Sequence, residues 1–274
     1  VTEWAKGACY RAAPEALWER VAAVGAVGVA PDGLNINAGC GSTDTAEAAA
    51  KVVASGADVG ICLDGDADRL MIIDETGRVA DGDQIMTLFA RRWAEDGRLS
   101  GNTLVATVMS NLGMERHLEG LGIALVRTGV GDRRVVEAMR AGGFNLGGEQ
   151  SGHIVMTDYA TTGDGLLAGL HFLAEMVATG QPASKLTQVF ETVPQVLENV
   201  RFVPGKAPLE DGRVKAAIAE GKARLEGQGR LLIRKSGTEP LVRVMAECED
   251  EALMAEVVGA IVAAVSRAAG QGGA

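Results

Sequence analysis

Aromatic residues, cysteines and long apolar runs are all scarce in this sequence of 274 residues. Because only 4% of the residues are aromatic, any core must be built from aliphatic side chains. The four cysteines form no Cys-x-x-Cys pair, which argues against a disulfide scaffold and favours a cytoplasmic location. The longest apolar run, residues 257–265, is far shorter than the roughly 18 residues of a membrane span, so we expect a soluble protein with no membrane partner.

Positive charge is also in the minority. The chain has 26 lysines and arginines against 36 aspartates and glutamates, a net charge of −10, so we expect no nucleic-acid partner. Glycine, in contrast, is abundant, and its 37 copies indicate many turns or close backbone contacts. Apolar residues make up 47% of the sequence, which is enough to fill real cores.

Short aliphatic runs alternate with segments of helical period in the first two thirds of the chain. Residues 59–63 and 70–73 predict two buried strands, and a helix at residues 45–54 would follow Asp44 as its N-cap. The same alternation predicts further helices at residues 14–24, 81–95, 112–121, 133–140 and 165–178.

The pattern changes after Pro182. Residues 195–203 and 241–247 alternate with the period of a strand, and residues 211–226 and 250–267 have the period of a helix. The sequence therefore predicts two α/β units followed by a smaller α+β domain.

An acidic loop lies between the two predicted strands. Asp64, Asp66 and Asp68 place three carboxylates at alternate positions, with no Cys or His within the loop itself, and such hard oxygen ligands favour Mg²⁺. A solvated acidic turn is the alternative, but three like charges this close repel one another unless a cation neutralises them. A calcium-binding EF-hand does not fit, because Arg69 stands where that loop needs glycine.

A second motif, Arg-Lys-Ser-Gly-Thr-Glu-Pro at residues 234–240, joins an apolar strand to an alternating one. The backbone N–H groups around Ser236, Gly237 and Thr238, with the guanidinium groups of Arg234 and Arg243, could wrap a phosphate. An ordinary hairpin with solvated basic residues is the alternative.

A third motif, Gly-Gly-Glu-Gln-Ser-Gly-His, occupies residues 147–153. If this segment is extended, Glu149 and Ser151 share one face, where a carboxylate and a hydroxyl could bind adjacent sugar hydroxyls. The alternative is a glycine-rich turn in which both side chains bond only to the backbone.

Taken in this order, the three motifs resemble the α-D-phosphohexomutase superfamily, and so do the segments at residues 31–37, 81–84, 130–133 and 161–165. Gln150 and Gly237-Thr238-Glu239 are similar to the branch that acts on glucosamine phosphates. The resemblance implies interconversion of glucosamine 6-phosphate and glucosamine 1-phosphate through a bisphosphorylated intermediate and an enzyme phosphoserine. A glucose or mannose phosphate mutase, or a non-catalytic phosphosugar-binding protein, is the alternative.

The resemblance also implies a domain organisation. Two phosphohexomutase-type α/β domains with mixed sheets, at residues 1–79 and 80–190, would precede a smaller α+β domain at residues 191–274. The superfamily's first domain carries the phosphorylated serine in a Ser-His-Asn loop, and no Ser-His-Asn occurs in this sequence. By resemblance, the chain is an incomplete enzyme that is inactive alone.

Residue roles follow from the same resemblance. Asp64, Asp66 and Asp68 would bind Mg²⁺, with Arg69 beside them as a catalytic residue. The phosphosugar would be bound by Glu149, Ser151, His153, Arg234, Ser236, Gly237, Thr238 and Arg243. The partner is then a small phosphosugar, and the family allows a homodimer.

Two positions depart from the superfamily's pattern. Gly129 stands where some relatives have a lysine before Val-Gly, and Arg134 replaces a tyrosine of the glucosamine branch. Arg133 or Arg134 could supply the positive charge that is missing at position 129.

Overall fold

The computed structural model describes residues 2–4, 23–237 and 239–270, which form two compact units. The first unit contains the described residues up to 110 and residues 114–191, and the second contains residues 111–113 and the described residues from 192 onward. Most of the helix predicted at residues 14–24, and Thr238, lie outside the described residues. In the described ranges, no helix has both the length and the apolar character needed to cross a membrane.

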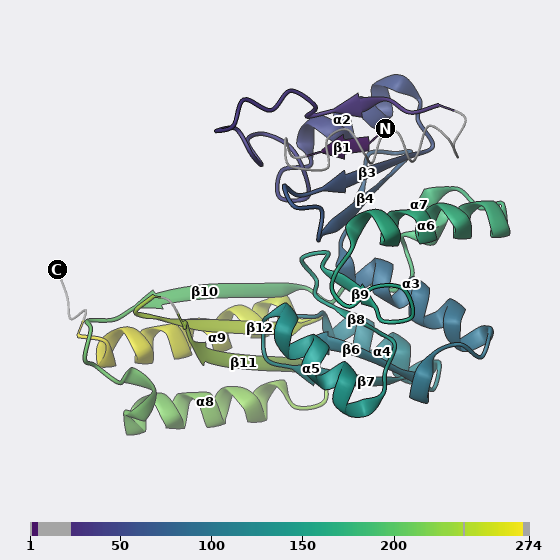
Figure 1. The fold of residues 1–274 in the computed structure, drawn as a ribbon. Helices are drawn as coiled ribbons and strands as arrows, with labels where there is room; N and C mark the ends of the chain where they lie inside the picture. The colour runs from purple at the N-terminus through teal and green to yellow at the C-terminus, as the bar shows by residue number, and fades with distance from the viewer. Residues whose placement is uncertain (1, 5–22, 238, 271–274) are drawn as a thin grey trace. The chain divides into compact units, whose positions relative to one another are not determined.

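A mixed five-stranded sheet forms one part of the first unit (Figure 1). Strand β1 runs parallel to β2 and β3, while β3, β4 and β5 pair antiparallel. The strands, in their order across the sheet, are β2 (Ala26–Val27), β1 (Thr2–Trp4), β3 (Val59–Leu63), β4 (Leu70–Asp74) and β5 (Val79–Ala80). Because Leu63 pairs with Leu70, the acidic loop is the connection of a β-hairpin.

A second mixed sheet of four strands completes the β structure of this unit. Strand β6 runs parallel to β7 and β8, and β8 and β9 pair antiparallel. Across the sheet the order is β7 (Ala124–Thr128), β6 (Thr103–Thr107), β8 (Leu146–Gly148) and β9 (Ile154–Met156).

Strand β8 is absent from the sequence prediction, which places its two glycines in the motif at residues 147–153. Both glycines instead permit close packing inside the sheet. A Cβ added to Gly147 would lie 2.8 Å from the carbonyl oxygen of Val105, and one added to Gly148 would overlap the carbonyl oxygen of His153. Glycine is therefore needed here for a close backbone approach rather than for a turn.

The predicted helices of this part of the chain are found within two residues of their expected bounds. They are α2 (Ala46–Ser55), α3 (Gly82–Glu95), α4 (Leu112–Gly120), α5 (Asp132–Gly142) and α6 (Gly165–Thr179), joined by the short α7 (Ala183–Leu186) and the 3₁₀ turn η1 (Ser100–Asn102). The expected N-cap of α2 is wrong. Thr45, not Asp44, occupies that position, and its side chain makes no capping hydrogen bond.

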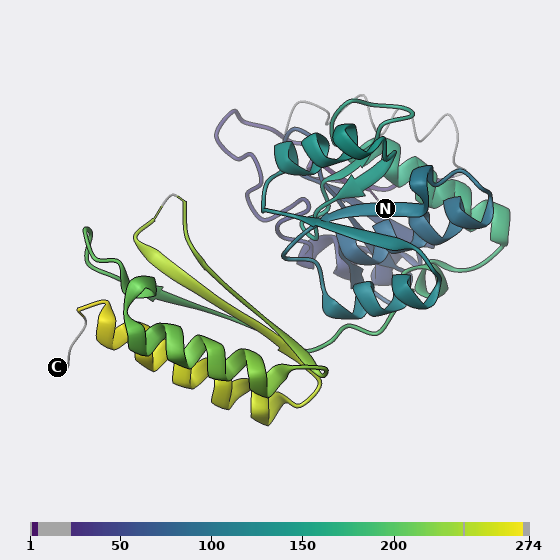
Figure 2. The ribbon, with the colours of Figure 1, turned by 90° about the horizontal axis from the view of Figure 1, so that it is seen from below.

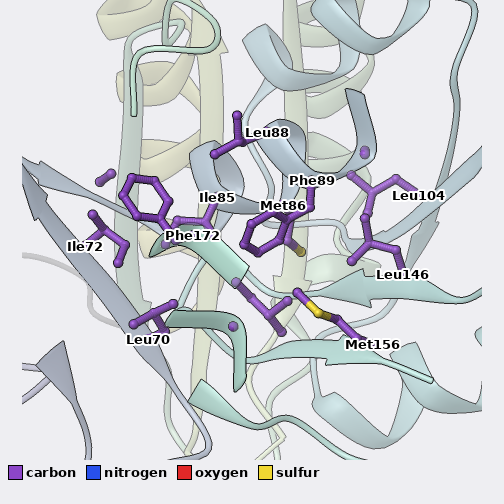
Figure 3. Close-up of a cluster of buried hydrophobic side chains, with 14 of the residues drawn as sticks. Leu70, Ile72, Ile85, Met86, Leu88, Phe89, Leu104, Leu146, Met156 and Phe172 are labelled. Carbon is purple, nitrogen blue, oxygen red and sulfur yellow. The ribbon is translucent and has the colours of Figure 1, made fainter. Parts of the chain in front are cut away.

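One hydrophobic core, mostly aliphatic but with Phe89, Trp93, Phe172 and Phe190, joins the two sheets of the first unit, as Figure 3 shows. Leu70 and Ile72 from the five-stranded sheet, Leu104 from the four-stranded sheet and Phe172 from α6 are all fully buried in it. Helix α3 contributes a nearly continuous buried face to the same core: Ile85, Met86, Leu88 and Phe89. The hydrophobic effect drives this burial. The shared core therefore holds both sheets together, and with them the loops at their ends.

The second unit is a three-stranded antiparallel sheet with two helices on one face (Figure 2). Its strands are β10 (Gln195–Arg201), β12 (Leu241–Cys248) and β11 (Gly229–Lys235) in spatial order. Its two helices are α8 (Gly212–Leu225) and α9 (Glu251–Ala268), and the 3₁₀ turn η2 (Pro208–Glu210) precedes α8. Val242 and Val244 of the sheet pack with Val214 of α8 and Ile261 of α9.

The observed architecture confirms the predicted fold class of α/β structure with mixed sheets followed by a smaller α+β domain. The boundaries expected after residues 79 and 190 stay predictions.

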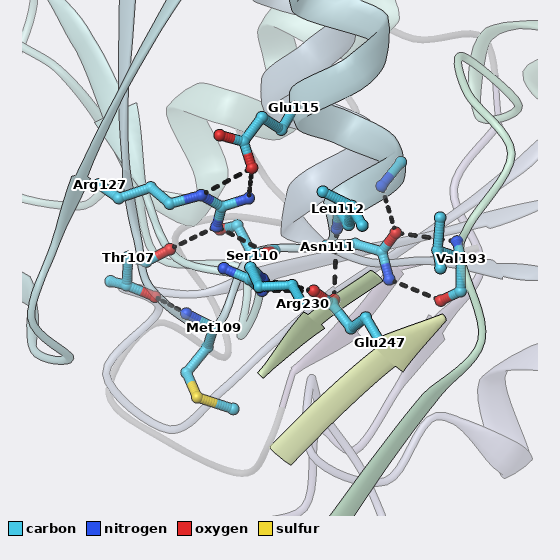
Figure 4. Close-up of polar contacts among 11 residues, drawn as sticks. Thr107, Met109, Ser110, Asn111, Leu112, Glu115, Arg127, Val193, Arg230 and Glu247 are labelled. Atoms are coloured by element: carbon cyan, nitrogen blue, oxygen red, sulfur yellow. Dashed lines mark hydrogen bonds and ion pairs between the residues drawn. The ribbon is translucent and has the colours of Figure 1, made fainter. Parts of the chain in front are cut away.

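A buried polar cluster in the second unit surrounds the side chain of Glu247 (Figure 4). Its carboxylate accepts hydrogen bonds from Arg230 Nε at 2.7 Å and from the backbone N–H of Leu112 at 3.3 Å. Beside it, Asn111 accepts from the N–H of Val193 at 3.0 Å and donates to the carbonyl oxygen of Val193 at 3.0 Å. These bonds satisfy polar groups that burial would otherwise leave without water.

Candidate active site

The acidic loop between β3 and β4 gathers three carboxylates. Oxygens of Asp64, Asp66 and Asp68 all lie within 4.8 Å of one another, and no other group of three such ligands occurs among the residues that the structure describes. The loop turns at Ala67, which has a positive φ of 60° and donates its N–H to the carbonyl oxygen of Asp64 at 3.1 Å. The tight turn is what brings the alternate carboxylates together.

The electrostatics of this loop favour a bound cation. Burial is the main cause that raises the pKa of the Asp64 carboxyl to about 6 from an ordinary 3.8; the charges of Asp68 and Asp66 act in the same direction, and the N–H of Arg69 opposes them. One buried oxygen of Asp68, Oδ1, has no hydrogen-bond partner among the described residues. A divalent cation would offset the repulsion among the three carboxylates, and an all-oxygen ligand set suits Mg²⁺.

Arg69 lies directly beside the carboxylates. Its Nε is 3.7 Å from Asp64 Oδ2 and 3.7 Å from Asp68 Oδ1, while 42% of the side chain remains exposed. Its backbone N–H also donates to Asp64 Oδ1 at 3.1 Å. Arg69 is therefore held by the acidic loop but is still accessible to an anion outside it.

His153, which the resemblance assigns to substrate binding, lies next to the same loop. The imidazole is 2% exposed, and its Nε2 is 3.5 Å from Asp68 Oδ2. A Cβ added to Gly163 would overlap the ring, so glycine at that position makes room for it. The backbones are tied together as well, because Leu70 donates its N–H to the carbonyl oxygen of Gly152 at 2.9 Å. The acidic loop and the third motif are thus adjacent in one unit.

The segment between β8 and β9 is a tight turn. Gly152, at a left-handed φ of 91°, donates to the carbonyl oxygen of Glu149 at 3.0 Å, and Glu149 donates to that of His153 at 2.9 Å. The segment is therefore not extended, so the expectation that Glu149 and Ser151 share one face of it is wrong, and the glycine-rich turn given as the alternative describes its backbone. Antiparallel pairing of β8 with β9 requires the chain to reverse here.

Within this turn the two predicted sugar ligands differ in their surroundings. The Glu149 carboxylate is half-buried and accepts a hydrogen bond from the backbone N–H of Gly131 at 2.9 Å, whereas Ser151 is exposed. Gly131 lies at the start of α5, within the segment 130–133 that resembles the superfamily, but its contact with Glu149 could not be predicted from the sequence.

The second predicted site lies at the turn between β11 and β12. Arg234 and Arg243 face each other directly across the two strands, and the Nε of each is buried without a hydrogen-bond partner in the described ranges. Burial, together with the positive charge of Arg243, lowers the pKa of the Arg234 guanidinium. Like charges opposite each other destabilise a sheet, so an anion bound between them would relieve that cost.

The turn itself is closed by backbone and hydroxyl contacts. Ser236 is buried and donates its N–H to the carbonyl oxygen of Leu241 at 2.9 Å, and its hydroxyl accepts from the N–H of Glu239 at 3.4 Å. Gly237 is exposed at the tip. The predicted contribution of Thr238 falls outside the described residues.

Two family models match the chain after residue 80. The model of "Phosphoglucomutase/phosphomannomutase, alpha/beta/alpha domain III" matches residues 81–193. The model of the C-terminal domain of the same family matches residues 197–264. The chain belongs to the phosphoglucomutase/phosphomannomutase family. This membership confirms the resemblance that the three motifs carry.

Among curated relatives, the chain is 72% identical over 268 residues to the phosphoglucosamine mutase of Jannaschia sp. (strain CCS1). The match covers 98% of this chain and 60% of the relative. The chain thus spans about 60% of the length of the curated relatives it matches.

Solved structures share the fold at low sequence identity. A phosphoglucomutase/phosphomannomutase family protein from Burkholderia thailandensis has a TM-score of 0.79 at 20% identity, over 100% of this chain and 60% of that one. The N-acetylphosphoglucosamine mutase of Aspergillus fumigatus, solved with GlcNAc-6P and magnesium, has a TM-score of 0.74 at 23% identity, over 98% and 61%.

Proposed function

We propose that this chain is part of a phosphoglucosamine mutase, which interconverts glucosamine 6-phosphate and glucosamine 1-phosphate through a bisphosphorylated intermediate and an enzyme phosphoserine. The observation that carries this proposal is the 72% identity to a phosphoglucosamine mutase along 98% of the chain. The sequence contains no Ser-His-Asn motif, so the phosphoserine has to come from residues outside these 274, and the chain alone is expected to be inactive.

The acidic loop would serve the phosphoryl-transfer end of the site. Asp64, Asp66 and Asp68 would hold Mg²⁺, which supplies positive charge to the phosphoryl group when bound. Arg69 adds a guanidinium beside the same carboxylates, and its exposed side chain is placed to contact phosphoryl oxygens. The close grouping of the three carboxylates supports this assignment, and the pKa of Asp64, raised mainly by burial and further by the charges of Asp68 and Asp66, marks a carboxylate that a bound cation would stabilise.

The two other turns would bind the remaining parts of the substrate. Glu149 and Ser151 would accept and donate hydrogen bonds to sugar hydroxyls. Arg234, Arg243 and Ser236 would hold the phosphate that does not react, because two buried, unpaired Nε–H groups supply donors for its oxygens. Phosphoryl transfer depends mainly on positioning and charge stabilisation, which is what these groups provide.

The location and partners complete the proposal. We place the enzyme in the cytoplasm, with a small phosphosugar as its partner, and a homodimer stays a prediction. The phosphosugar is supported by the Aspergillus fumigatus relative of the same fold, which was solved with GlcNAc-6P.

The decisive experiment compares the full-length protein on three substrates. With Mg²⁺ present, kcat/KM for glucosamine 1-phosphate is expected to exceed that for glucose 1-phosphate and mannose 1-phosphate by about tenfold or more. A higher value for glucose or mannose would assign the other branch of the family. Binding of all three sugars without turnover would instead indicate a phosphosugar-binding protein.

Asp66→Asn provides the matched negative control for that experiment, because it removes one carboxylate and keeps the shape of the side chain. Turnover should be lost while the fold is retained. The same substitution at Asp58, an exposed aspartate outside the acidic loop, should leave turnover unchanged.

A further inference from the structure

Gly129 and Arg134 pack against each other where β7 leads into α5. A Cβ added to Gly129 would lie 3.0 Å from Cδ of Arg134 and 3.0 Å from Nη1 of its guanidinium. The arginine side chain therefore folds back from the helix and lies over Gly129, which has no side chain of its own. Any side chain at position 129 would compete with it for this space.

This part of α5 is connected to the turn that carries Glu149. The backbone N–H of Gly131 donates to Glu149 Oε1 at 2.9 Å, and the carbonyl oxygen of Gly131 accepts from the N–H of Arg134 at 3.0 Å. One residue thus bonds both to the proposed sugar ligand and to the residue whose guanidinium covers Gly129.

The two arginines at the start of α5 differ in what they contact. Arg133 points into solvent, with 88% of its side chain exposed, and pairs with Glu137 of the same helix at 2.9 Å. The exposed side chain of Arg134 makes no hydrogen bond or ion pair with any residue that the structure describes. Of these two arginines, Arg134 therefore has the uncommitted guanidinium, and its backbone is connected through Gly131 to Glu149.

We propose that Arg134 is a substrate-binding residue that contacts a phosphate oxygen of the phosphosugar held by Glu149, an inference that rests on the proposed mutase function. A carboxylate at the sugar site repels the negative phosphate of the same substrate, and a neighbouring guanidinium offsets that repulsion. Its planar pair of donors suits phosphate oxygens. Glycine at position 129 provides the room in which this guanidinium lies.

The test uses the full-length protein with glucosamine 1-phosphate and Mg²⁺. Arg134→Ala should raise KM by about ten- to a hundredfold, the range expected for loss of a charge-assisted hydrogen bond, with a smaller change in kcat. Arg133→Ala is the matched control, because it removes the same group one residue away, and it should leave KM within about twofold.

A double variant that moves the positive charge from position 134 to position 129 distinguishes a role of Arg134 in binding from a structural role. Gly129 has no left-handed φ, so Gly129→Lys combined with Arg134→Ala can place an ammonium in the vacated space. This double variant should recover most of the lost affinity, and the dependence of KM on salt should weaken in Arg134→Ala and return in the double variant. A raised KM with neither rescue nor a change in salt dependence would show a structural role and overturn the proposal.

The remaining outcomes distinguish this inference from the proposed function. An active wild type together with an unchanged KM in Arg134→Ala overturns the role of Arg134 and leaves the mutase function standing. An inactive wild type overturns the function, and calorimetric titration with glucosamine 6-phosphate then decides the role of Arg134. Weaker binding by Arg134→Ala supports that role, and equal binding contradicts it.

Discussion

The buried imidazole of His153 lies 3.5 Å, Nε2 to Oδ2, from the carboxylate of Asp68. The two residues lie in connections of different sheets of the first unit, β3–β4 and β8–β9, and the pair joins the acidic loop to the turn that carries Glu149. Groups immediately behind a metal ligand orient it, and their loss lowers metal affinity. His153 is therefore expected to affect the site even without touching Mg²⁺.

We predict that His153→Gln weakens Mg²⁺ binding by about tenfold or more, because it removes the ring that faces Asp68. Isothermal titration of the full-length protein with Mg²⁺ measures the change, and circular dichroism verifies the fold. His171→Gln is the control, since that ring packs on Tyr159 with 4.8 Å between ring centroids and edge-on against Phe89 and Trp93. Equal Mg²⁺ affinity in wild type and His153→Gln would contradict the prediction.

Arg234 and Arg243 lead to a prediction about phosphate and stability. In the wild type, inorganic phosphate should raise the melting temperature, because it binds between two like charges in the folded state only. Arg234→Ala should lose most of this increase and raise KM for the phosphosugar by about ten- to a hundredfold. Thermal unfolding with and without phosphate provides the measurement. Arg213→Ala, an exposed arginine on α8, should retain the full increase.

Burial of Asp81 leads to a prediction about pH. Its carboxylate caps α3 by accepting from the N–H of Gln84 at 3.2 Å, and burial raises its pKa although the bonds from Gln84 and Gln150 oppose the shift. A raised pKa means that the folded state binds the proton more tightly than the unfolded state. The stability contributed by this proton is present at acid pH and is lost as pH rises through the folded-state pKa.

Asp81→Asn keeps a capping oxygen and removes the titration. Relative to wild type, this variant should gain stability as pH rises from about 4 to about 7, as measured by thermal unfolding at each pH. Asp250→Asn at the N-cap of α9, where the carboxylate accepts from Leu253, corrects for the exchange of the capping group itself. A difference between Asp81→Asn and wild type that stays constant with pH would be evidence against the argument.

Chemistry carried by one short segment could be predicted from the sequence, but contacts between segments could not. The alternate spacing of Asp64, Asp66 and Asp68 already indicated a cation site, because a turn brings such side chains together wherever the loop lies. The approach of His153 to Asp68 depends instead on how two sheets share one core, which periodicity does not report.

Glycine was the main source of error in the sequence prediction. Local propensity treats Gly147 and Gly148 as turn residues, whereas both lie in β8, where neighbouring backbones approach too closely for a Cβ. The loop that follows then had to be a turn rather than extended, which placed Glu149 against Gly131. Propensity describes a residue's own conformational freedom, and tertiary packing decides how that freedom is used.

The buried ion pair of the second unit leads to a last prediction, about folding. Glu247 is fully buried and Arg230 is 19% exposed, so removing either partner leaves a charge that water cannot solvate well. Glu247→Ala should lower the free energy of unfolding by about 3–5 kcal/mol, measured by urea denaturation of the full-length protein, whereas Glu251→Ala on the exposed face of α9 should change it little. Replacing both partners together, with Arg230→Met and Glu247→Leu, should recover much of the loss, because the cost comes from the orphaned charge rather than from the missing bond. If the double variant is as unstable as Glu247→Ala, the hydrogen bond to the N–H of Leu112 is the more important contact of Glu247.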